Sequence, residues 1–242
     1  MSPLGRGRSH LSFDQHTVTK HVTNAWEPLY MRRFPDVFVE VHDIKHLSFT
    51  MKRLQEPDYN EPHTLLEASS SLKLLWNTPW RGSDKDWREK LRTHLYDLGF
   101  VAKPHIDDLI QLLPDVNEPV LIHGDPTLAN LLQGPDGYFW IDPLLRAYIP
   151  GDPHVDLGKM FQSCLGYEQV LLGNHPLLVT KTEITQQRKL MHDLANLHQL
   201  DYNIGLTWCV VHFIRLIPYQ VEKDRDVFGS YMIALLNEVL SS

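Results

Sequence analysis

Hydrophobic and polar positions alternate in the first quarter of the chain and follow a helical period in most of the remainder. Residues 37–41 alternate with the period of two that is typical of a half-buried strand, and residues 17–22 and 49–54 are two further candidate strands. A short helix is expected over residues 24–33. The polar, proline-bounded stretch 55–62 then separates this strand-rich part from a mainly helical part.

The helical part contains one short strand and one hairpin. Val120 begins a brief apolar run, and the turn GPDG at residues 134–137 joins two strand-like segments. The predicted helices cover residues 65–76, a segment from an Asp84 cap to Gly99, and residues 106–113, 154–172, 181–200, 203–217 and 224–240. We therefore expect two lobes, residues 1–56 and residues 57–242.

Composition narrows the class of protein. The chain has 242 residues, 43% of them hydrophobic, and a net charge of −7, values of an ordinary globular protein. The acidic balance argues against nucleic acid as a main partner, because phosphate binding needs a basic face. Two cysteines make no disulfide framework, and we find neither a signal peptide nor an apolar run long enough for a membrane span. We expect a cytoplasmic protein that does not bind membranes; its oligomeric state is undetermined.

Candidate chemistry is concentrated in HGDPTLANLL, residues 123–132, and in WIDP, residues 140–143. Asp125 and Asn130 lie on a loop that leaves an apolar segment, and the hairpin should bring Asp142 back beside Asn130. One carboxylate and one amide oxygen suit Mg²⁺, which keeps waters and binds substrate phosphates. A second carboxylate can accept a proton from an attacking hydroxyl. This set is the minimum for phosphoryl transfer.

These two segments, together with GDPHVDLGKM at residues 151–160, resemble the aminoglycoside phosphotransferase and choline kinase-like family of the protein-kinase-like superfamily. The closest similarity is to members of polysaccharide-biosynthesis type. The resemblance is strong over residues 118–172, only positional over the N-terminal lobe, and weak after residue 180.

The resemblance implies an α+β, protein-kinase-like fold with a reduced N-terminal β lobe and a larger helical C-terminal lobe. It also implies ATP and Mg²⁺ as cofactors, and a small-molecule hydroxyl acceptor such as a sugar, an aminoglycoside or an amino alcohol. By position, Asp125 would be the catalytic carboxylate, and Asn130 and Asp142 would be metal ligands.

Residues around this segment have supporting roles in the same interpretation. His123 is expected to pack and hold the loop rather than to transfer protons. Asp152, followed by Pro153, has the pattern of a helix N-cap. Asp156 could reach back to the backbone of the catalytic loop.

The nucleotide-binding residues of the N-terminal lobe are less defined. Lys20 is the candidate phosphate-binding lysine, or else a solvated lysine on a strand. Glu27 could pair with Lys20, or could close a capping box with Asn24. Gly5 and Gly7 resemble a phosphate-binding loop only loosely and fit a flexible terminus better.

Competing functions are also open. His42 and His46 have a spacing that zinc peptidases place on helices, but here the spacing follows a strand pattern. A catalytically silent pseudokinase remains the main alternative to an enzyme. A kinase of protein side chains is disfavoured by the lack of a recognisable activation segment after Asp142.

The acceptor is expected to be neutral or cationic, because the negative net charge of the protein repels anions. Glu168, Asp193 and Asp201 are candidate contacts for an amino group on such an acceptor.

Overall fold

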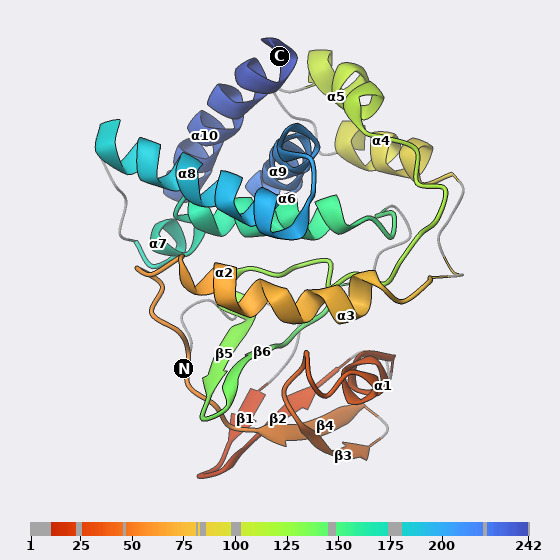
Figure 1. Ribbon diagram of the computed structural model, residues 1–242, viewed down its shortest axis with the longest axis vertical. Coiled ribbons are helices and arrows are strands. Elements are labelled where there is room, and N and C mark those ends of the chain that lie inside the picture. The colour runs from red at the N-terminus through yellow and green to blue at the C-terminus, as the bar shows by residue number, and fades with distance from the viewer. Residues whose placement is uncertain are drawn as a thin grey trace.

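The computed structural model of the protein describes residues 11–22, 26–45, 47–80, 82, 86–97, 103–144, 149–173, 181–219 and 222–241. Within these ranges a small antiparallel sheet with one helix forms a lower lobe, and a larger set of helices forms the upper lobe (Figure 1). The expected α+β, two-lobed fold is therefore confirmed. No helix of the described ranges is both long and apolar enough to cross a membrane.

The sheet lobe has its strands in the order β1-β2-β4-β3, all antiparallel. Two of the predicted strands, in residues 17–22 and 49–54, are confirmed as β2 and β4, and the predicted short helix is α1. The elements of this lobe are β1 (Leu11–Phe13), β2 (Thr17–His21), α1 (Trp26–Arg33), β3 (Val41–Lys45) and β4 (Ser48–Lys52). The proposed cap Asn24 and the glycines Gly5 and Gly7 lie outside the described residues.

The prediction of a half-buried strand over residues 37–41 is wrong. Val37, Phe38 and Val39 are all buried, and the strand of this region, β3, only begins at Val41. The backbone of this segment instead pairs with Trp140 of the hairpin: Val39 N donates to Trp140 O (3.2 Å), and Trp140 N donates to Val37 O (2.8 Å). The hairpin therefore covers a side of this segment that a half-buried strand would leave exposed. The alternation of side chains does not predict which of them are exposed here, because all three are buried.

The helical lobe contains the predicted hairpin, formed by β5 (Leu131–Gly134) and β6 (Gly137–Trp140). The helix expected over residues 65–76 is the continuous run of α2 (Thr64–Ala68), a 3₁₀ turn (Ser69–Leu72) and α3 (Lys73–Trp76). The other helices of the described ranges are α4 (Trp87–Asp97), α5 (Ile106–Leu112), α6 (Pro153–Cys164), α7 (Tyr167–Leu171), α8 (Lys181–His198), α9 (Tyr202–Leu216) and α10 (Glu222–Ser241).

Two predictions in this lobe are corrected. The helix expected over residues 154–172 is divided into α6 and α7, because Gly166 adopts a left-handed φ of 84°. The short strand expected at residues 120–122 is reduced to one bridge between Val120 and Pro79. The expected helix ends Asp84 and Gly99 lie outside the described residues.

The centre of the helical lobe is α6, whose residues are buried from Val155 to Cys164. It packs closely on α9, since a Cβ atom on Gly158 would come within 2.6 Å of the Cβ atom of Trp208. In Figure 1, α6 runs across the middle of the lobe, above α2 and α3. A buried central helix is a rigid support, and Asp156, Lys159 and Ser163 along it contact the loop of residues 123–130.

Candidate active site

The loop that follows Ile122 is shaped by a glycine. Gly124 has φ of 82°, and a Cβ atom there would lie 1.9 Å from the carbonyl oxygen of Leu144, so only glycine fits. The peptide N–H of Leu144 in turn donates to the carbonyl of His123 (2.7 Å). This close approach joins the loop carrying Asp125 to the segment carrying Asp142.

His123 is a packed residue. Its ring stacks on Phe38 and meets Trp140 edge-on, and its Nδ1 accepts a hydrogen bond from the peptide N–H of Asp125 (3.2 Å). Burial lowers the pKa of His123 to about 4, so the ring is neutral near pH 7. A neutral ring that accepts from the backbone holds the loop in the manner expected from the sequence.

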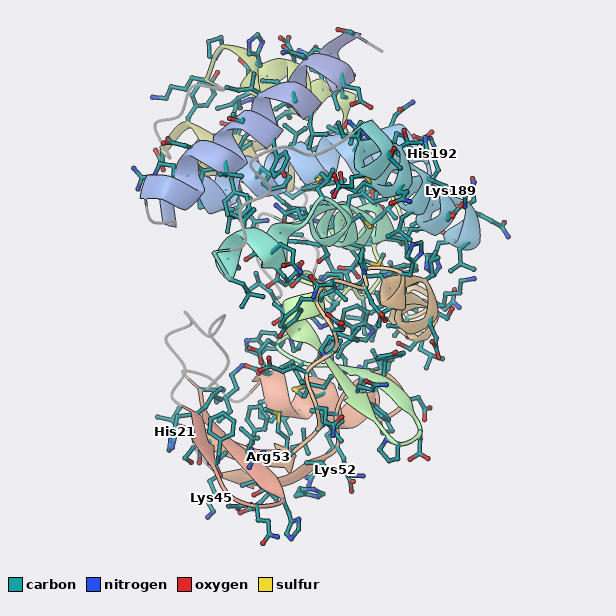
Figure 2. All side chains as sticks on the ribbon, turned by 90° about the vertical axis from the view of Figure 1, so that its left-hand side faces the viewer. His21, Lys45, Lys52, Arg53, Lys189 and His192 are labelled. Atoms are coloured by element: carbon teal, nitrogen blue, oxygen red, sulfur yellow. The ribbon has the colours of Figure 1, made fainter. Side chains whose placement is uncertain are left out.

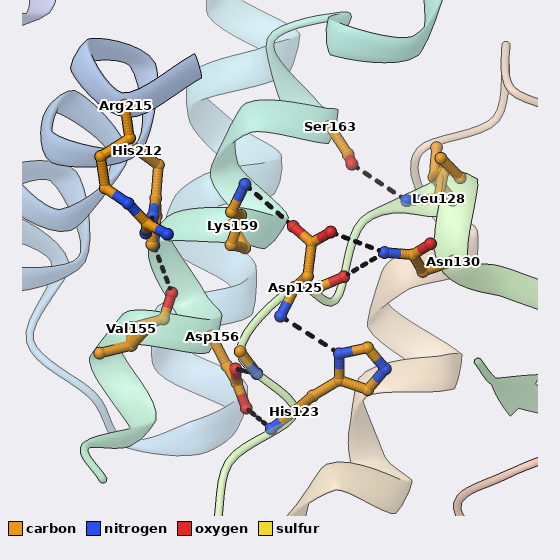
Figure 3. A network of polar contacts seen from close by, with 12 residues as sticks. His123, Asp125, Leu128, Asn130, Val155, Asp156, Lys159, Ser163, His212 and Arg215 are labelled. Carbon is orange, nitrogen blue, oxygen red and sulfur yellow. Dashed lines mark hydrogen bonds and ion pairs between the residues drawn. The ribbon is translucent and has the colours of Figure 1, made fainter. Parts of the chain in front are cut away.

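Asp156, in the first turn of α6, holds the backbone of the same loop (Figure 3). Its Oδ2 accepts from the peptide N–H of His123 (2.9 Å) and from Nε1 of Trp76 (2.9 Å), and its Oδ1 accepts from the peptide N–H of Gly124 (2.7 Å). Burial raises the pKa of Asp156 to about 6, although the three donors act to lower it. Asp156 therefore reaches back to the loop backbone, and the buried carboxylate has three donors in place of water.

The carboxylate of Asp125 is held at both oxygens. Lys159 Nζ lies 2.9 Å from Oδ1, and Asn130 Nδ2 donates to Oδ2 (2.9 Å) and to the backbone carbonyl of the same residue (2.8 Å). Burial acts to raise the pKa of Asp125, but the charge and hydrogen bond of Lys159, together with His123 and Asn130, outweigh burial and lower the pKa. The side chain is still 29% exposed. Asp125 is thus an ionised, partly accessible carboxylate with a fixed orientation.

Lys20, Glu27 and Asp142 form an ion-pair network between the two lobes. Lys20 Nζ, from β2, lies 2.7 Å from Oε1 of Glu27 on α1 and 2.6 Å from Oδ1 of Asp142. Burial acts to lower the pKa of Lys20, but the two carboxylates overcome it and raise the pKa. Glu27 lies in the first turn of α1 and still reaches the lysine. Of the alternatives for Lys20, the structure has the buried, ion-paired lysine and not the solvated one.

The end of the hairpin brings Asp142 to Asn130. The peptide N–H of Ile141 donates to the carbonyl of Asn130 (2.9 Å), and Asp142 follows with a left-handed φ of 57°. A non-glycine residue in this region is uncommon, and such residues persist where the surrounding structure holds the backbone in place. The arrangement brings together Asp125, Asn130 and Asp142, as the hairpin predicts.

The donor atoms of this site suit a hard cation. Asn130 uses its amide nitrogen toward Asp125 and leaves its amide oxygen available, and Asp142 leaves Oδ2 available beside the oxygen that contacts Lys20. One amide and one carboxylate oxygen are a suitable protein contribution to Mg²⁺, which takes its other ligands from water and phosphates. Within the described residues there is no group of three or more His, Cys, Asp and Glu side chains that could form a metal cage. His42 lies on strand β3, and His46 lies outside the described residues.

Among the described residues, Asp152 makes its hydrogen bonds at the start of α6 and not with the loop that carries Asp125. It is the N-cap of α6, where Oδ1 accepts from the peptide N–H of His154 (2.9 Å) and contacts Nδ1 of the same residue (2.7 Å). Its role is therefore to begin the helix that carries Asp156 and Lys159.

Ser163 on α6 was not identified from the sequence, and the buried position of Glu168 on α7 was not expected. Ser163 Oγ accepts from the peptide N–H of Leu128 (3.1 Å) and donates to Oε1 of Glu168 (2.7 Å), which also accepts from the peptide N–H of Ala129 (3.3 Å). Glu168 is 1% exposed, and burial raises its pKa to about 7. The sequence-based suggestion that Glu168 contacts an acceptor is wrong, because this side chain is buried against the loop of residues 123–130.

The other suggested acceptor contacts are also engaged elsewhere. Asp193 pairs with Lys189 on the surface of α8, and Asp201 caps α9 through the peptide N–H groups of Asn203 and Ile204. Lys159, the other missed residue, carries a signal in the sequence: it lies three positions after Asp156 on the same helix, a spacing that places both side chains on one face.

A cavity of about 560 Å³ lies in the helical lobe, and its lining residues do not include Asp125, Asn130 or Asp142. Ser163 forms part of its floor, one helical turn after Lys159 on α6. Its walls are both polar and apolar, and the polar lining residues include Tyr59, Asn60, His63, Gln169, Glu183, Gln186 and Gln187. Amide side chains both donate and accept hydrogen bonds, which suits a ligand with several hydroxyl groups.

Searches against family models and against curated protein sequences find no match to this chain. Solved structures with the same fold are found. A glucosamine kinase in complex with glucosamine, ADP and inorganic phosphate has a TM-score of 0.60 at 12% identity, over 96% of this chain and 81% of that chain. The GDP complex of aminoglycoside 2′-phosphotransferase-IIIa has a TM-score of 0.54 at 13% identity, over 98% and 90%.

A Plasmodium vivax ethanolamine kinase has a TM-score of 0.50 at 13% identity, over 96% of this chain and 82% of that chain. At these identities the likeness establishes the fold alone. The chain therefore has the two-lobed, kinase-like fold of these small-molecule phosphotransferases.

Proposed function

We propose that this protein is an ATP- and Mg²⁺-dependent phosphotransferase that moves the γ-phosphoryl group to a hydroxyl of a small molecule. The observation that carries the proposal is the convergence of two groups of residues at the junction of the lobes. Lys20, Glu27 and Asp142 form one group, and Asp125 and Asn130 form the other. Fold likeness to small-molecule kinases supports the same reaction class.

The roles follow from position and charge. Lys20, held on β2 by Glu27, would bind the nucleotide phosphates as a cation on a rigid strand. Asn130 and Asp142 would hold Mg²⁺, which when bound neutralises charge on the phosphates of the nucleotide. Asp125, partly exposed and fixed at both oxygens, would orient the acceptor hydroxyl and accept its proton.

We further propose that the acceptor binds in the 560 Å³ cavity and that it is a neutral or cationic molecule bearing several hydroxyl groups. The lining of the cavity includes Ser163, which follows Lys159 by one turn on α6, and the size of the cavity falls within the range of small-molecule sites. Gln187→Leu should raise the KM for the acceptor roughly threefold to tenfold, the value of a lost hydrogen bond, and leave nucleotide affinity unchanged. An unchanged KM would show that the acceptor does not bind in this cavity.

The activity itself is tested with purified protein, Mg²⁺ and ATP or GTP. Nucleotide should raise the melting temperature, and EDTA should remove most of that rise. ADP formation should increase with at least one member of a panel of amino sugars, aminoglycosides, sugars and amino alcohols. No rise in melting temperature at millimolar ATP or GTP would overturn the proposal.

One observation favours the alternative of a silent nucleotide-binding module. Both oxygens of Asp125 are already engaged, by Lys159 and by Asn130. A thermal shift with nucleotide but no turnover with any acceptor, or with water, would support this alternative.

A further inference from the structure

Lys159 is a buried lysine that contacts the carboxylate of Asp125 and belongs to a different part of the chain from the loop of residues 123–130. It belongs to α6, it is 9% exposed, and its Nζ lies 2.9 Å from Oδ1 of Asp125 (Figure 3). The loop itself, residues 123–130, has no lysine or arginine. The positive charge beside Asp125 is therefore supplied by a helix.

Burying a lysine is costly, and an ordinary structural position does not need one. Transfer of an ammonium group out of water is strongly unfavourable, and pairing with a carboxylate offsets this cost only when the geometry is good. Replacing such an ion pair as a whole by well-packed apolar side chains is often neutral or stabilising. Retention of the charge at this point of α6 calls for a reason other than stability.

The helix holds the loop in two separate ways. Asp156 accepts hydrogen bonds from the backbone of His123 and Gly124, and Lys159, on the next turn, contacts the side chain of Asp125. Asn130 binds the other oxygen of the same carboxylate. With one oxygen held from α6 and the other from within the loop, the plane of the Asp125 carboxylate is fixed.

We propose that Lys159 is a positioning residue for phosphoryl transfer, which acts by fixing the carboxylate of Asp125 toward the acceptor hydroxyl. This inference rests on the proposed function. Orientation of reacting groups is a large part of catalysis in phosphoryl transfer, where the protein forms few covalent bonds of its own. Misplacement of such a group by about 1 Å costs on the order of 10² in rate.

The test is a double-mutant cycle on turnover. Lys159→Met should lower kcat by roughly 10- to 100-fold with the KM for nucleotide nearly unchanged. In an Asp125→Asn background, Lys159→Met should cause little further loss, because a residue that acts through Asp125 has nothing left to position. Lys159→Arg, which keeps the charge, should restore most of the activity.

Two measures keep the test decisive if Lys159→Met folds poorly. The Asp125→Asn/Lys159→Met variant leaves no buried charge unpaired and should fold, and the arginine variant reports on charge alone. The matched control is Lys189→Met, which removes a lysine from a helical ion pair on the surface of α8 and should leave kcat unchanged.

The outcomes separate the two proposals. If the natural protein shows no phosphoryl transfer to any acceptor or to water, the proposed function fails and this inference with it. If the natural protein turns over and Lys159→Met keeps its kcat per folded molecule, only this inference is overturned. Losses that multiply in the double mutant, with a lower melting temperature, would also overturn it, since they indicate a structural role.

Discussion

Lys20 and Asp142 are 122 residues apart in the sequence, and the nitrogen of the one lies 2.6 Å from an oxygen of the other. The contact joins strand β2 of the sheet lobe to the end of the hairpin in the helical lobe. Because Glu27 holds the same nitrogen at 2.7 Å, the lysine is fixed by two carboxylates.

Lys20→Met should lose most of the rise in melting temperature that Mg²⁺ and ATP produce, measured against the melting temperature of the variant without nucleotide. The reason is that the phosphates lose their cation. Lys45→Met is the control: Lys45 is an exposed lysine on β3 of the same lobe (Figure 2), and its removal should leave the rise intact. Equal rises in the two variants would exclude Lys20 from the nucleotide site.

Changing each of the two aspartates of the site to asparagine should affect nucleotide affinity and turnover differently. Asp142→Asn removes a charge from the proposed metal site, and should weaken Mg²⁺-nucleotide binding and abolish turnover together. Asp125→Asn should bind nucleotide nearly as well and lose roughly 10²–10⁴ in rate, the value of a positioned general base. Calorimetry and a phosphoryl-transfer assay measure the two effects, and equal losses of affinity would contradict separate roles.

Asp156→Asn should destabilise the protein, because Asp156 holds the loop backbone at His123 and Gly124. The carboxylate accepts three hydrogen bonds in a buried position, and an amide nitrogen would face at least one of those donors. We expect a loss of about 1–3 kcal/mol in the free energy of unfolding by denaturant. Asp201→Asn is the matched control, since asparagine is as good an N-cap as aspartate, and it should cost only a few tenths of a kcal/mol. Similar losses of unfolding free energy in the two variants would show that the hydrogen bonds to Asp156 add no stability.

Glu168 should make stability fall as pH rises. Burial raises its pKa in the folded protein to about 7 from the usual 4.5, so the folded state binds the proton more tightly than the unfolded state. The resulting loss of stability develops between about pH 4.5 and 7 and is on the order of 3 kcal/mol when complete. Glu168→Gln lacks this titration, so its melting temperature relative to the natural protein should rise from pH 5 to pH 8. A difference that is constant over this range would show that Glu168 does not titrate there.

Two helical glycines should respond in opposite directions to alanine. At Gly229 on α10 a Cβ atom meets nothing within 4 Å, so alanine should stabilise the helix by up to about 1 kcal/mol. At Gly158 a Cβ atom would come within 2.8 Å of the backbone nitrogen of Cys209, so α6 and α9 would have to separate. We expect Gly158→Ala to lower the melting temperature, and a neutral result would indicate that this helix pair can move apart freely.

Local sequence determined much of the fold of this protein. Strands β2 and β4, the hairpin β5–β6 and most helices appear where β-branched runs, a GPDG turn and helical periods predict them, because these signals act over a few neighbouring residues. The N-cap Asp152 is predicted for the same reason. The spacing of Asp125, Asn130 and Asp142 also allowed the candidate site to be predicted, since a hairpin returns the chain to its start.

Tertiary structure decided which segments distant in the sequence contact and bury one another. Residues 37–39 read as a strand, but the hairpin covers their second side, and no local pattern contains that information. A glutamate in a helix, such as Glu168, is expected on the solvent-exposed face. It is buried here because α7 packs against the loop of residues 123–130. The pairing of Lys159 with Asp125 likewise depends on which face of α6 lies against that loop, and packing across the whole lobe sets that face.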